Sequence, residues 1–419
     1  MNRDFISYAN SFQTVITLGL ERIAALLALL GNPQEQLRCI HVAGTNGKGS
    51  VCAFLQSILT HSGYRTGLYT SPNLVRVNER ITIDGSPIAD DALEAVLLQI
   101  EALVGEVKKM TGNEPTQFEI WTAAAFSYFR AQHCDYVVLE TGLGGTYDAT
   151  NVISHPAASV ITRIDLDHMQ YLGDTIAQIA SQKCGIIKEP ACGTRAYTIT
   201  GQQPPEAMTV IQRAASDKKN VLLTTQQPRI HTPEKIHEVF DYNGIQRITC
   251  PLPGPHQIDN AAIAIETARA LGISDAAIKV GLESAVHPGR FELLCEQPPV
   301  IYDGAHNKNG VQALLAALDR YYPDEARSYV FASMKDKDIL PSLKMMKQEN
   351  SQFYFVTVMD NERAMQPEEL CALAKEAGIT GTSFHDLRAA CEAAMQNPGI
   401  TVICGSLYLY KDLMAFWQK

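Results

Sequence analysis

The sequence predicts an α/β protein with two domains: a P-loop-type domain around a parallel sheet in residues 1–296, and a smaller Rossmann-like α/β domain in residues 297–419. The first observation is a glycine-rich turn at 44–50 that joins a short apolar strand to a helical pattern. The second is a series of strands, apolar on both faces, that alternate with helices, as in a parallel sheet covered on both sides. The third is a turn-rich segment at 287–299, after which a new β/α alternation begins.

Composition and charge exclude several classes of protein. A chain of 419 residues, 46% hydrophobic and 19% charged, is long enough for two domains with substantial cores. The net charge of −10, without a long run of lysine and arginine, argues against a nucleic-acid-binding surface. The ten cysteines include no Cys-x-x-Cys pair, which indicates buried free thiols in a reducing compartment. The sequence has neither a signal peptide nor an apolar run long enough to cross a bilayer, so we expect a cytoplasmic protein without membrane contact.

Periodicity and turn residues define the elements of the first domain. Helical spacing covers residues 18–30, 51–59, 90–110 and 118–131. Short apolar strands are predicted at residues 39–43, 64–70, 136–139 and 158–162. Ligands of parallel sheets bind beyond the carboxyl ends of the strands. The glycine-rich turn, Ser71, Glu140 and His168 each follow a strand, so we expect them on one edge of the sheet.

After residue 200, the regular alternation of strands and helices is interrupted before a second alternation begins in the second domain. Loops rich in glutamine and proline interrupt residues 200–253, and Val239–Thr249 is predicted to form a hairpin around an Asn-Gly turn. Two helices are expected at 256–270 and 276–285, followed by the join between the domains at 287–299. The strands predicted in the second domain are residues 300–303, 328–332, 352–358 and 400–404.

The turn at 44–50 is predicted to bind phosphate. A strand that enters a helix through glycines leaves backbone N–H groups free at the positive end of the helix dipole. Lys48 adds a charge for terminal phosphates, and Ser50 stands where a hydroxyl meets Mg²⁺. The common P-loop has its first glycine six residues before the lysine, a position that Val42 occupies here. A purely structural turn is therefore the alternative interpretation.

Other candidate residues also have two interpretations. Glu140 is placed to reach the Mg²⁺ of a bound nucleotide, or to cap the next helix. A lone histidine such as His168 is more often a hydrogen-bonded surface or core residue, but its position on the same edge favours a functional role. Ser71, before a proline, is by itself a turn residue. Lys183 lies near the C-terminal end of a predicted helix. The residues alone indicate a solvated lysine whose charge interacts favourably with the helix dipole.

Arg290 and Asp303 lie beside the join between the domains. They can pair with each other or hold a nucleotide where the domains meet, because domain interfaces are common small-molecule sites. Isolated arginine and aspartate residues near a linker do not decide between these two interpretations.

Six motifs, in order along the chain from about Leu18 to the C-terminus, resemble those of the bacterial folylpolyglutamate synthases of the Mur ligase superfamily, which are often bifunctional with dihydrofolate synthase. They are Gly44-Thr-Asn-Gly-Lys-Gly-Ser50, Thr70-Ser-Pro72, Glu140-Thr-Gly-Leu-Gly-Gly145 with Asp148-Ala-Thr-Asn151, Leu166-Asp-His168, Pro288-Gly-Arg-Phe291 and Asp303-Gly-Ala-His-Asn307. The resemblance makes the first domain an ATPase domain and the second a glutamate-ligase domain.

The resemblance also implies roles for individual residues. Residues that would hold ATP are Gly44, Thr45, Asn46, Gly47, Lys48, Gly49, Ser50, Asn260, Arg290 and Asp303, the last two closing the second domain over the nucleotide. Residues that would hold magnesium are Ser71, Glu140 and His168. Lys48, His168 and a Lys183 carbamylated by CO₂ would take part in catalysis, with K⁺ as a monovalent activator. Residues that would border the pterin, the incoming glutamate or the nucleotide are Leu18, Gly19, Leu20, Glu21, Thr116, Gln117, Phe118, Glu119, Tyr147, His306 and Asn307.

The implied activity is an ATP-dependent ligation of L-glutamate to dihydropteroate, to reduced folates or to both, through an acyl phosphate, by a monomer. The alternatives are a synthase acting on folates only, another amide ligase of the superfamily, and a non-catalytic nucleotide-binding switch. Peptidoglycan Mur ligases carry a further domain before the P-loop, which needs about 100 residues, whereas only 43 precede Gly44. A second β/α domain that carries Arg290 and Asp303 argues against a switch.

Two positions depart from the family pattern. Thr146 stands where the family usually has arginine, and Asn73 stands where it often has histidine. Both positions are expected to affect how the pteroate or folate tail is held, so they leave the substrate preference open.

Overall fold

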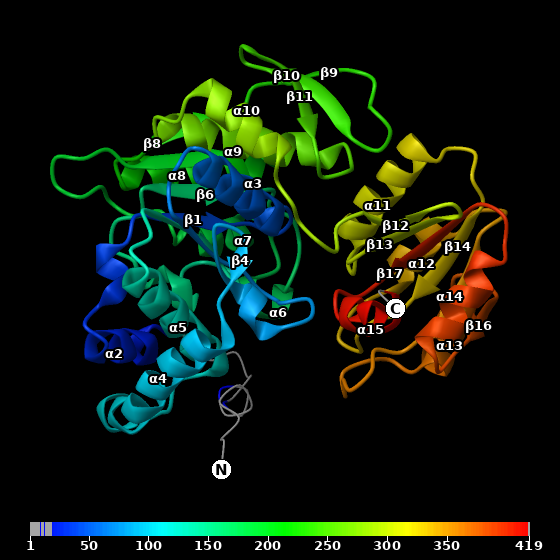
Figure 1. The fold of residues 1–419 in the computed structure, drawn as a ribbon, viewed down its shortest axis with the longest axis horizontal. Helices are drawn as coiled ribbons and strands as arrows, with labels where there is room; N and C mark the ends of the chain where they lie inside the picture. Colours follow the sequence, from blue (N-terminus) through cyan, green and yellow to red (C-terminus); the bar gives the residue numbers. More distant parts are fainter. Residues whose placement is uncertain (1–8, 10–11, 13–18, 418–419) are drawn as a thin grey trace. The chain divides into compact units, whose positions relative to one another are not determined.

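The computed structural model describes residues 9, 12 and 19–417, which form two compact units (Figure 1). The first unit contains the described residues up to Arg229, with Phe240–Ile248 and Asp259–Val286. The second contains Ile230–Val239, Thr249–Ile258 and the chain from His287 onward. Residues 287–296, which the sequence assigned to the first domain, cluster with the second unit.

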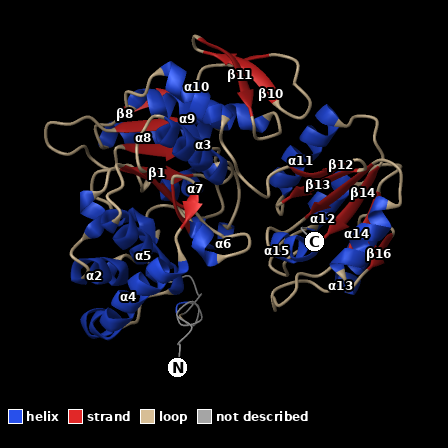
Figure 2. Ribbon diagram, in the orientation of Figure 1, coloured by secondary structure: helices blue, strands red, loops and turns tan. Residues whose placement is uncertain are grey.

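An eight-stranded sheet, in the order β4-β3-β2-β5-β1-β6-β7-β8, forms the centre of the first unit. Figure 2 draws the strands in red and the helices around them in blue. Six strands are parallel: β1 (Cys39–Ala43), β2 (Thr66–Tyr69), β5 (Tyr136–Glu140), β6 (Ala158–Ile161), β7 (Tyr197–Thr200) and β8 (Val221–Thr224). The predicted parallel sheet is therefore confirmed. An antiparallel extension that the sequence did not predict consists of β3 (Ile81–Ile83) and β4 (Ser86–Pro87).

Helices cover both faces of this sheet. They are α2 (Glu21–Leu29), α3 (Lys48–His61), α4 (Asp90–Thr111), α5 (Gln117–Ala131), α6 (Met169–Leu172), α7 (Ile176–Cys184), α8 (Pro205–Asp217), α9 (His256–Ala270) and α10 (Asp275–Glu283). The ends of α4 follow elementary rules: two aspartates occupy its first turn, two lysines its last, and Gly112 follows with φ 80°. On one face, α3 packs against α10, and the Ser57 hydroxyl donates to the Gly281 carbonyl at 2.6 Å.

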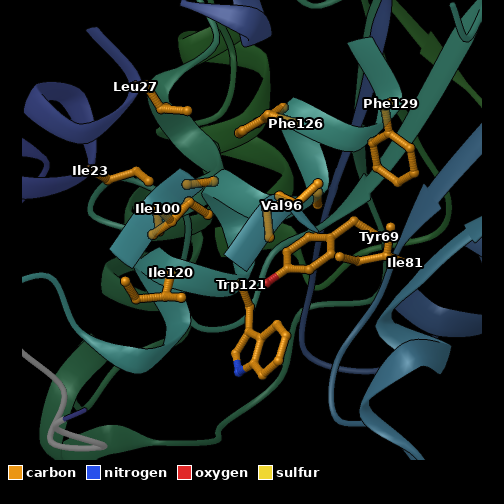
Figure 3. Close-up of a cluster of buried hydrophobic side chains, with 14 of the residues drawn as sticks. Ile23, Leu27, Tyr69, Ile81, Val96, Ile100, Ile120, Trp121, Phe126 and Phe129 are labelled. Atoms are coloured by element: carbon orange, nitrogen blue, oxygen red, sulfur yellow. The ribbon is translucent and has the colours of Figure 1, made fainter. Parts of the chain in front are cut away.

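One core of the first unit lies where α2, α4 and α5 pack against the sheet (Figure 3). Trp121 and Tyr69 are fully buried in it. A buried ion pair at 3.0 Å, between Arg22 Nε and Glu119 Oε2, joins α2 to α5 at this core. A second core packs α7 and α8 against β1 and β6. These cores hold the loops that follow β1, β5 and β6 against a rigid scaffold.

A six-stranded sheet, in the order β12-β13-β17-β14-β15-β16, forms the second unit. Its strands are β12 (Glu292–Glu296), β13 (Pro299–Asp303), β14 (Arg327–Phe331), β15 (Gln352–Phe355), β16 (Gly381–Ser383) and β17 (Ile400–Cys404). Only β12, on the edge, is antiparallel, and its pairing with β13 explains why residues 287–296 belong here. Its helices are α11 (Lys308–Tyr321), α12 (Leu340–Met346), α13 (Pro367–Glu376), α14 (Leu387–Met395) and α15 (Leu409–Trp417).

The predicted hairpin is also present. Strands β10 (Glu238–Tyr242) and β11 (Ile245–Cys250) pair in a small sheet with β9 (Arg229–Ile230). Positive φ angles at Asn243 (43°) and Gly244 (96°) are those of the tight turn that an Asn-Gly sequence favours. In the described part of the chain, no helix combines the length and the apolar character needed to cross a membrane.

Candidate active site

The glycine-rich turn connects the end of β1 to the start of α3, as predicted. Gly47 precedes α3 with φ 87°, a left-handed conformation that glycine adopts without strain. A Cβ atom at this position would lie 2.3 Å from Asn260 Oδ1, so the Asn260 side chain packs directly on the turn. The structure thereby brings together Gly47 and Asn260, two predicted nucleotide-binding residues that are far apart in the sequence.

Not all backbone N–H groups of the turn are free, which corrects the expectation from the sequence. The N–H groups of Thr45 and Asn46 donate to the Arg163 carbonyl at 2.9 and 3.2 Å. The Thr45 hydroxyl also donates to the Asp165 carbonyl at 3.0 Å, so the loop after β6 holds this half of the turn. The N–H groups of Lys48 and Gly49 lie in the first turn of α3, where a helix has no intrahelical partners for its N–H groups, so they stay the expected phosphate donors.

Two lysine side chains meet at one carbonyl oxygen of the turn. Lys48 Nζ donates to Gly44 O at 3.1 Å, and Lys183 Nζ donates to the same oxygen at 2.7 Å. Lys183 lies in the last turn of α7 and is only 4% exposed, so the interpretation of a solvated lysine is wrong. Burial, and then the charge of Lys48, lower the pKa of Lys183 to about 7, against a smaller opposing effect of Asp167 and Asp148.

Ser71 and Glu140 lie together at the ends of β2 and β5. The Ser71 N–H points at Glu140 Oε2 at 3.4 Å, and Glu140 is 7% exposed. Burial raises the pKa of the Cys52 thiol in α3, Glu140 raises it further and Lys48 opposes the rise, so both charges lie near the same helical turn. The alternative role of Glu140, as the cap of the next helix, is filled by Asp148. The Asp148 side chain accepts from the Thr150 N–H at 3.0 Å.

His168 lies at the start of α6, on the loop that follows β6. Its side chain is 42% exposed, and its Nε2 atom lies 3.8 Å from Asp167 Oδ2. Among the described residues, no group of three or more histidine, cysteine, aspartate or glutamate side chains is arranged to hold a metal ion. Mg²⁺ usually binds one or two carboxylates, with phosphates and waters as its other ligands. The buried Glu140 beside Ser71 fits such a site, and His168 as a ligand stays a prediction.

The residues predicted to border the pterin fall into two groups. Thr116 and Glu119 form the capping box of α5: Glu119 N donates to Thr116 Oγ1 at 3.3 Å, and Thr116 N donates to Glu119 Oε2 at 2.7 Å. Glu119 is thus occupied in a structural role, which includes the ion pair with Arg22. Phe118 packs on Tyr69 with ring centroids 6.0 Å apart, and Tyr147 is 48% exposed.

The remaining residues of this prediction lie at two helix starts. Gly19, Leu20 and Glu21 stand at the beginning of α2, and Gln117 is the first residue of α5. Leu18 lies outside the described residues.

The second unit has its own set of predicted residues at the end of β13. Asp303 is half-buried and accepts from the N–H groups of Phe291 and Ala305, each at 2.7 Å. Burial raises the pKa of Asp303, and the nearby Arg290 guanidinium opposes the rise, so these two predicted residues are neighbours. His306 Nδ1 lies 2.9 Å from the Gly304 carbonyl, and Asn307 caps α11 by accepting from Gly310 N at 2.8 Å.

The two departures from the family pattern lie against parts of the site in the first unit. Thr146 donates through its hydroxyl to the Gln182 carbonyl at 3.0 Å, next to Lys183. Asn73 Oδ1 accepts from Arg80 Nε at 2.8 Å. Arg80 was not among the residues predicted from the sequence, because a single arginine before a short strand carries no recognisable pattern.

Two family models match the chain. The model of the Mur ligase middle domain matches residues 42–268, and that of the Mur ligase glutamate ligase domain matches residues 289–407. The first match covers more than half of the chain, and the two together contain most of the predicted site residues of both units.

Named relatives extend over almost the whole chain. The dihydrofolate synthase/folylpolyglutamate synthase of Bacillus subtilis is 37% identical over 94% of each chain. The Escherichia coli protein of the same name is 33% identical over 98% of this chain and 94% of its own.

Solved structures share this fold closely. Mycobacterium tuberculosis folylpolyglutamate synthase, solved with ADP and AMPPCP, has a TM-score of 0.89 at 30% identity over 96% of each chain. Escherichia coli FolC, solved with DHPP and ADP, has a TM-score of 0.85 at 31% identity over 98% of this chain and 96% of its own. The chain therefore belongs to the Mur ligase family, within its group of folylpolyglutamate and dihydrofolate synthases, and is an ATP-dependent ligase.

Proposed function

We propose that this ligase adds L-glutamate both to dihydropteroate and to reduced folates, through an acyl-phosphate intermediate. The observation that carries the proposal is the meeting of Lys48 and Lys183 at Gly44 O, on the sheet edge where Glu140 and Ser71 also lie. Three relatives, from Bacillus subtilis, Escherichia coli and Mycobacterium tuberculosis, carry both synthase names, which supports the choice of acceptors.

The chemistry follows from the nature of a carboxylate. A carboxylate does not accept an amine at pH 7, so an oxygen of the acceptor first attacks the γ-phosphorus of ATP, and ADP leaves. The α-amine of glutamate then attacks the carbonyl carbon of the acyl phosphate, loses a proton and displaces phosphate. Lys48 and the N–H groups at the start of α3 stabilise the charge of the transferred phosphoryl group. Positioning of the two reactants supplies much of the acceleration.

A divalent cation completes the charge balance in this proposal. Mg²⁺, held by Ser71, Glu140 and His168, would neutralise charge on the phosphates of ATP when bound. The pKa of Lys183, lowered to about 7, makes the neutral amine accessible near neutral pH, which supports its carbamylation. The neutral amine attacks CO₂ and releases one proton, so a buried neutral amine becomes a carbamate anion next to Lys48.

The remaining assignments carry less structural support. In the first unit, we propose that Asn260 contacts the nucleotide, and that Phe118 and Tyr147, with residues 18–21, border the pterin. In the second unit, we propose nucleotide contacts for Arg290 and Asp303, and glutamate or nucleotide contacts for His306 and Asn307. We further propose a cytoplasmic monomer, with K⁺ as an activator.

Release of ADP that depends on glutamate tests the function directly. With ATP and Mg²⁺ present, we expect turnover with dihydropteroate and with tetrahydrofolate as separate acceptors, measured by a coupled ADP assay. Turnover with tetrahydrofolate alone would identify a folylpolyglutamate synthase without the second activity. Binding of ATP without glutamate-dependent turnover on either acceptor would contradict the proposal and favour a nucleotide-binding switch.

The substitution Glu140→Gln is expected to weaken the dependence on magnesium. The change removes the charge of a buried carboxylate and keeps its shape, so the Mg²⁺ concentration for half-maximal activity should rise about 10–100-fold. A magnesium titration of steady-state activity measures the effect, with the exposed Glu106→Gln in α4 as the matched control. An unchanged titration curve would remove Glu140 from the ligands.

A further inference from the structure

Arg80 is a half-buried arginine on the same edge of the sheet as Ser71. It is the last residue of the 3₁₀ helix η2 (Val77–Arg80), directly before β3. Its carbonyl accepts from the N–H of Thr70 at 3.1 Å, which fixes its backbone opposite the residue that precedes Ser71. The position of Arg80 is therefore tied to the end of β2, where the proposed magnesium site begins.

The guanidinium of Arg80 is held by neutral groups. Its Nε donates to Asn73 Oδ1 at 2.8 Å, and it also interacts with the hydroxyl of Tyr69. Tyr69 lies in the core of the first unit (Figure 3), and its hydroxyl lies 3.2 Å from Thr122 Oγ1. These contacts orient the guanidinium plane, but none of them brings a negative charge to it.

The carboxylate of Glu79, next to Arg80 in the sequence, binds backbone N–H groups of its own loop. Glu79 accepts from the N–H groups of Leu74 (2.8 Å), Val75 (3.1 Å) and Arg76 (2.8 Å), and so closes its own loop. Among the residues that the structure describes, no carboxylate forms an ion pair with Arg80. A cation that is partly removed from water and balanced only by neutral groups is costly, and an anionic ligand removes that cost.

Arg80 also connects the two regions that an acceptor has to reach. Its partner Tyr69 packs on Phe118, with ring centroids 6.0 Å apart, in the segment proposed to border the pterin. Its other partner, Asn73, lies two residues beyond Ser71. The acceptor is an elongated molecule with a pterin at one end and a carboxylate at the other, and that carboxylate has to approach the γ-phosphate of ATP.

We propose that Arg80 binds a carboxylate of the acceptor, and that Asn73 positions the guanidinium for this contact. The inference rests on the proposed function, because it takes dihydropteroate and reduced folates as the acceptors. The planar guanidinium presents parallel N–H groups that match the two oxygens of a carboxylate. Two sources share this chemistry: the carboxylate that becomes phosphorylated, present in both acceptors, and the α-carboxylate of a folate's glutamate tail, absent from dihydropteroate.

The test is the substitution Arg80→Gln, assayed with dihydropteroate and with tetrahydrofolate as separate acceptors. We expect KM for the acceptor to rise about 10–100-fold, as for the loss of a hydrogen-bonded charge pair, while KM for ATP stays unchanged. Arg80→Lys keeps the positive charge but loses the parallel N–H groups of the guanidinium. Its KM for the acceptor should lie between those of the unsubstituted enzyme and Arg80→Gln. Arg76→Gln is the matched control, because Arg76 lies in the same loop, is 60% exposed and pairs with Asp90 at 2.6 Å.

Binding of each acceptor in the presence of ADP, measured by calorimetry, supplies a readout without turnover. A loss of affinity for both acceptors identifies the reacting carboxylate as the partner of Arg80, and a loss for tetrahydrofolate alone identifies the tail. Unchanged acceptor binding in folded Arg80→Gln protein overturns the inference, as does an equal rise in KM for ATP. Absence of turnover in the unsubstituted enzyme would instead contradict the proposed function, so the two failures are distinguishable.

Discussion

Replacing Lys48 with alanine is expected to reduce turnover about 10²–10³-fold, the loss that follows removal of one preorganised charge from a transition state. The fold should change little, because the described contacts of the Lys48 ammonium are with the carbonyls of Gly44 (3.1 Å) and Thr45 (3.4 Å), both in its own turn. Steady-state ADP release measures the first effect, and thermal unfolding measures the second.

The same substitution should also act on Lys183. The charge of Lys48 is the second cause of the low pKa of Lys183, so its removal raises that pKa and reduces the neutral amine at pH 7. The effects of Lys48→Ala and Lys183→Ala on turnover are therefore expected to be less than additive. Lys108→Ala, an exposed lysine in α4, is the control for a general effect of charge. Near-normal turnover in folded Lys48→Ala protein would exclude the phosphate-binding role of the turn.

The parts of the fold that the sequence predicts are those that local rules determine. The apolar strand Cys39–Ala43, the glycine-rich turn and the helix after it are contiguous, and so is the Asn-Gly hairpin. Strand β12 was missed because it lies in a segment of turn-forming residues, and only its pairing with β13 makes it a strand. Strands β3 and β4, of three and two residues, are too short for a periodic signal.

In the candidate site, too, the sequence predicts what local rules determine and misses what depends on contacts between distant residues. The residues that follow strands were predicted together because parallel strands end at one edge, and the contact of Ser71 with Glu140 agrees with that rule. Lys183 was not recognisable, because its burial depends on contact with Gly44, 139 positions away in the sequence. The partners of Arg80 depend on how the loop after β2 folds back, which no periodicity encodes.

Replacing Lys183 with alanine is expected to abolish turnover, and small carboxylates such as acetate should partly restore it. The alanine leaves space where the carbamate would supply an anion, and a free carboxylate has the same charge and a similar shape. Lys188→Ala is the matched control: Lys188 follows in the same segment, is half-buried, and burial also lowers its pKa. Unmodified Lys183 in fully active enzyme would remove the carbamate from the proposal.

The pH dependence gives this prediction a second readout. The folded pKa of Lys183, about 7, lies below its ordinary 10.5, so between these values the unfolded chain binds more protons than the folded one. Without CO₂, the free energy of unfolding should therefore rise with pH across this window, and Lys183→Met should remove that rise. At a fixed concentration of dissolved CO₂, carbamate and activity should fall as the pH drops through 7, because the protonated amine does not attack CO₂. Nuclear magnetic resonance with ¹³C-labelled bicarbonate measures the carbamate, whose signal should be absent from Lys183→Ala and present in Lys188→Ala.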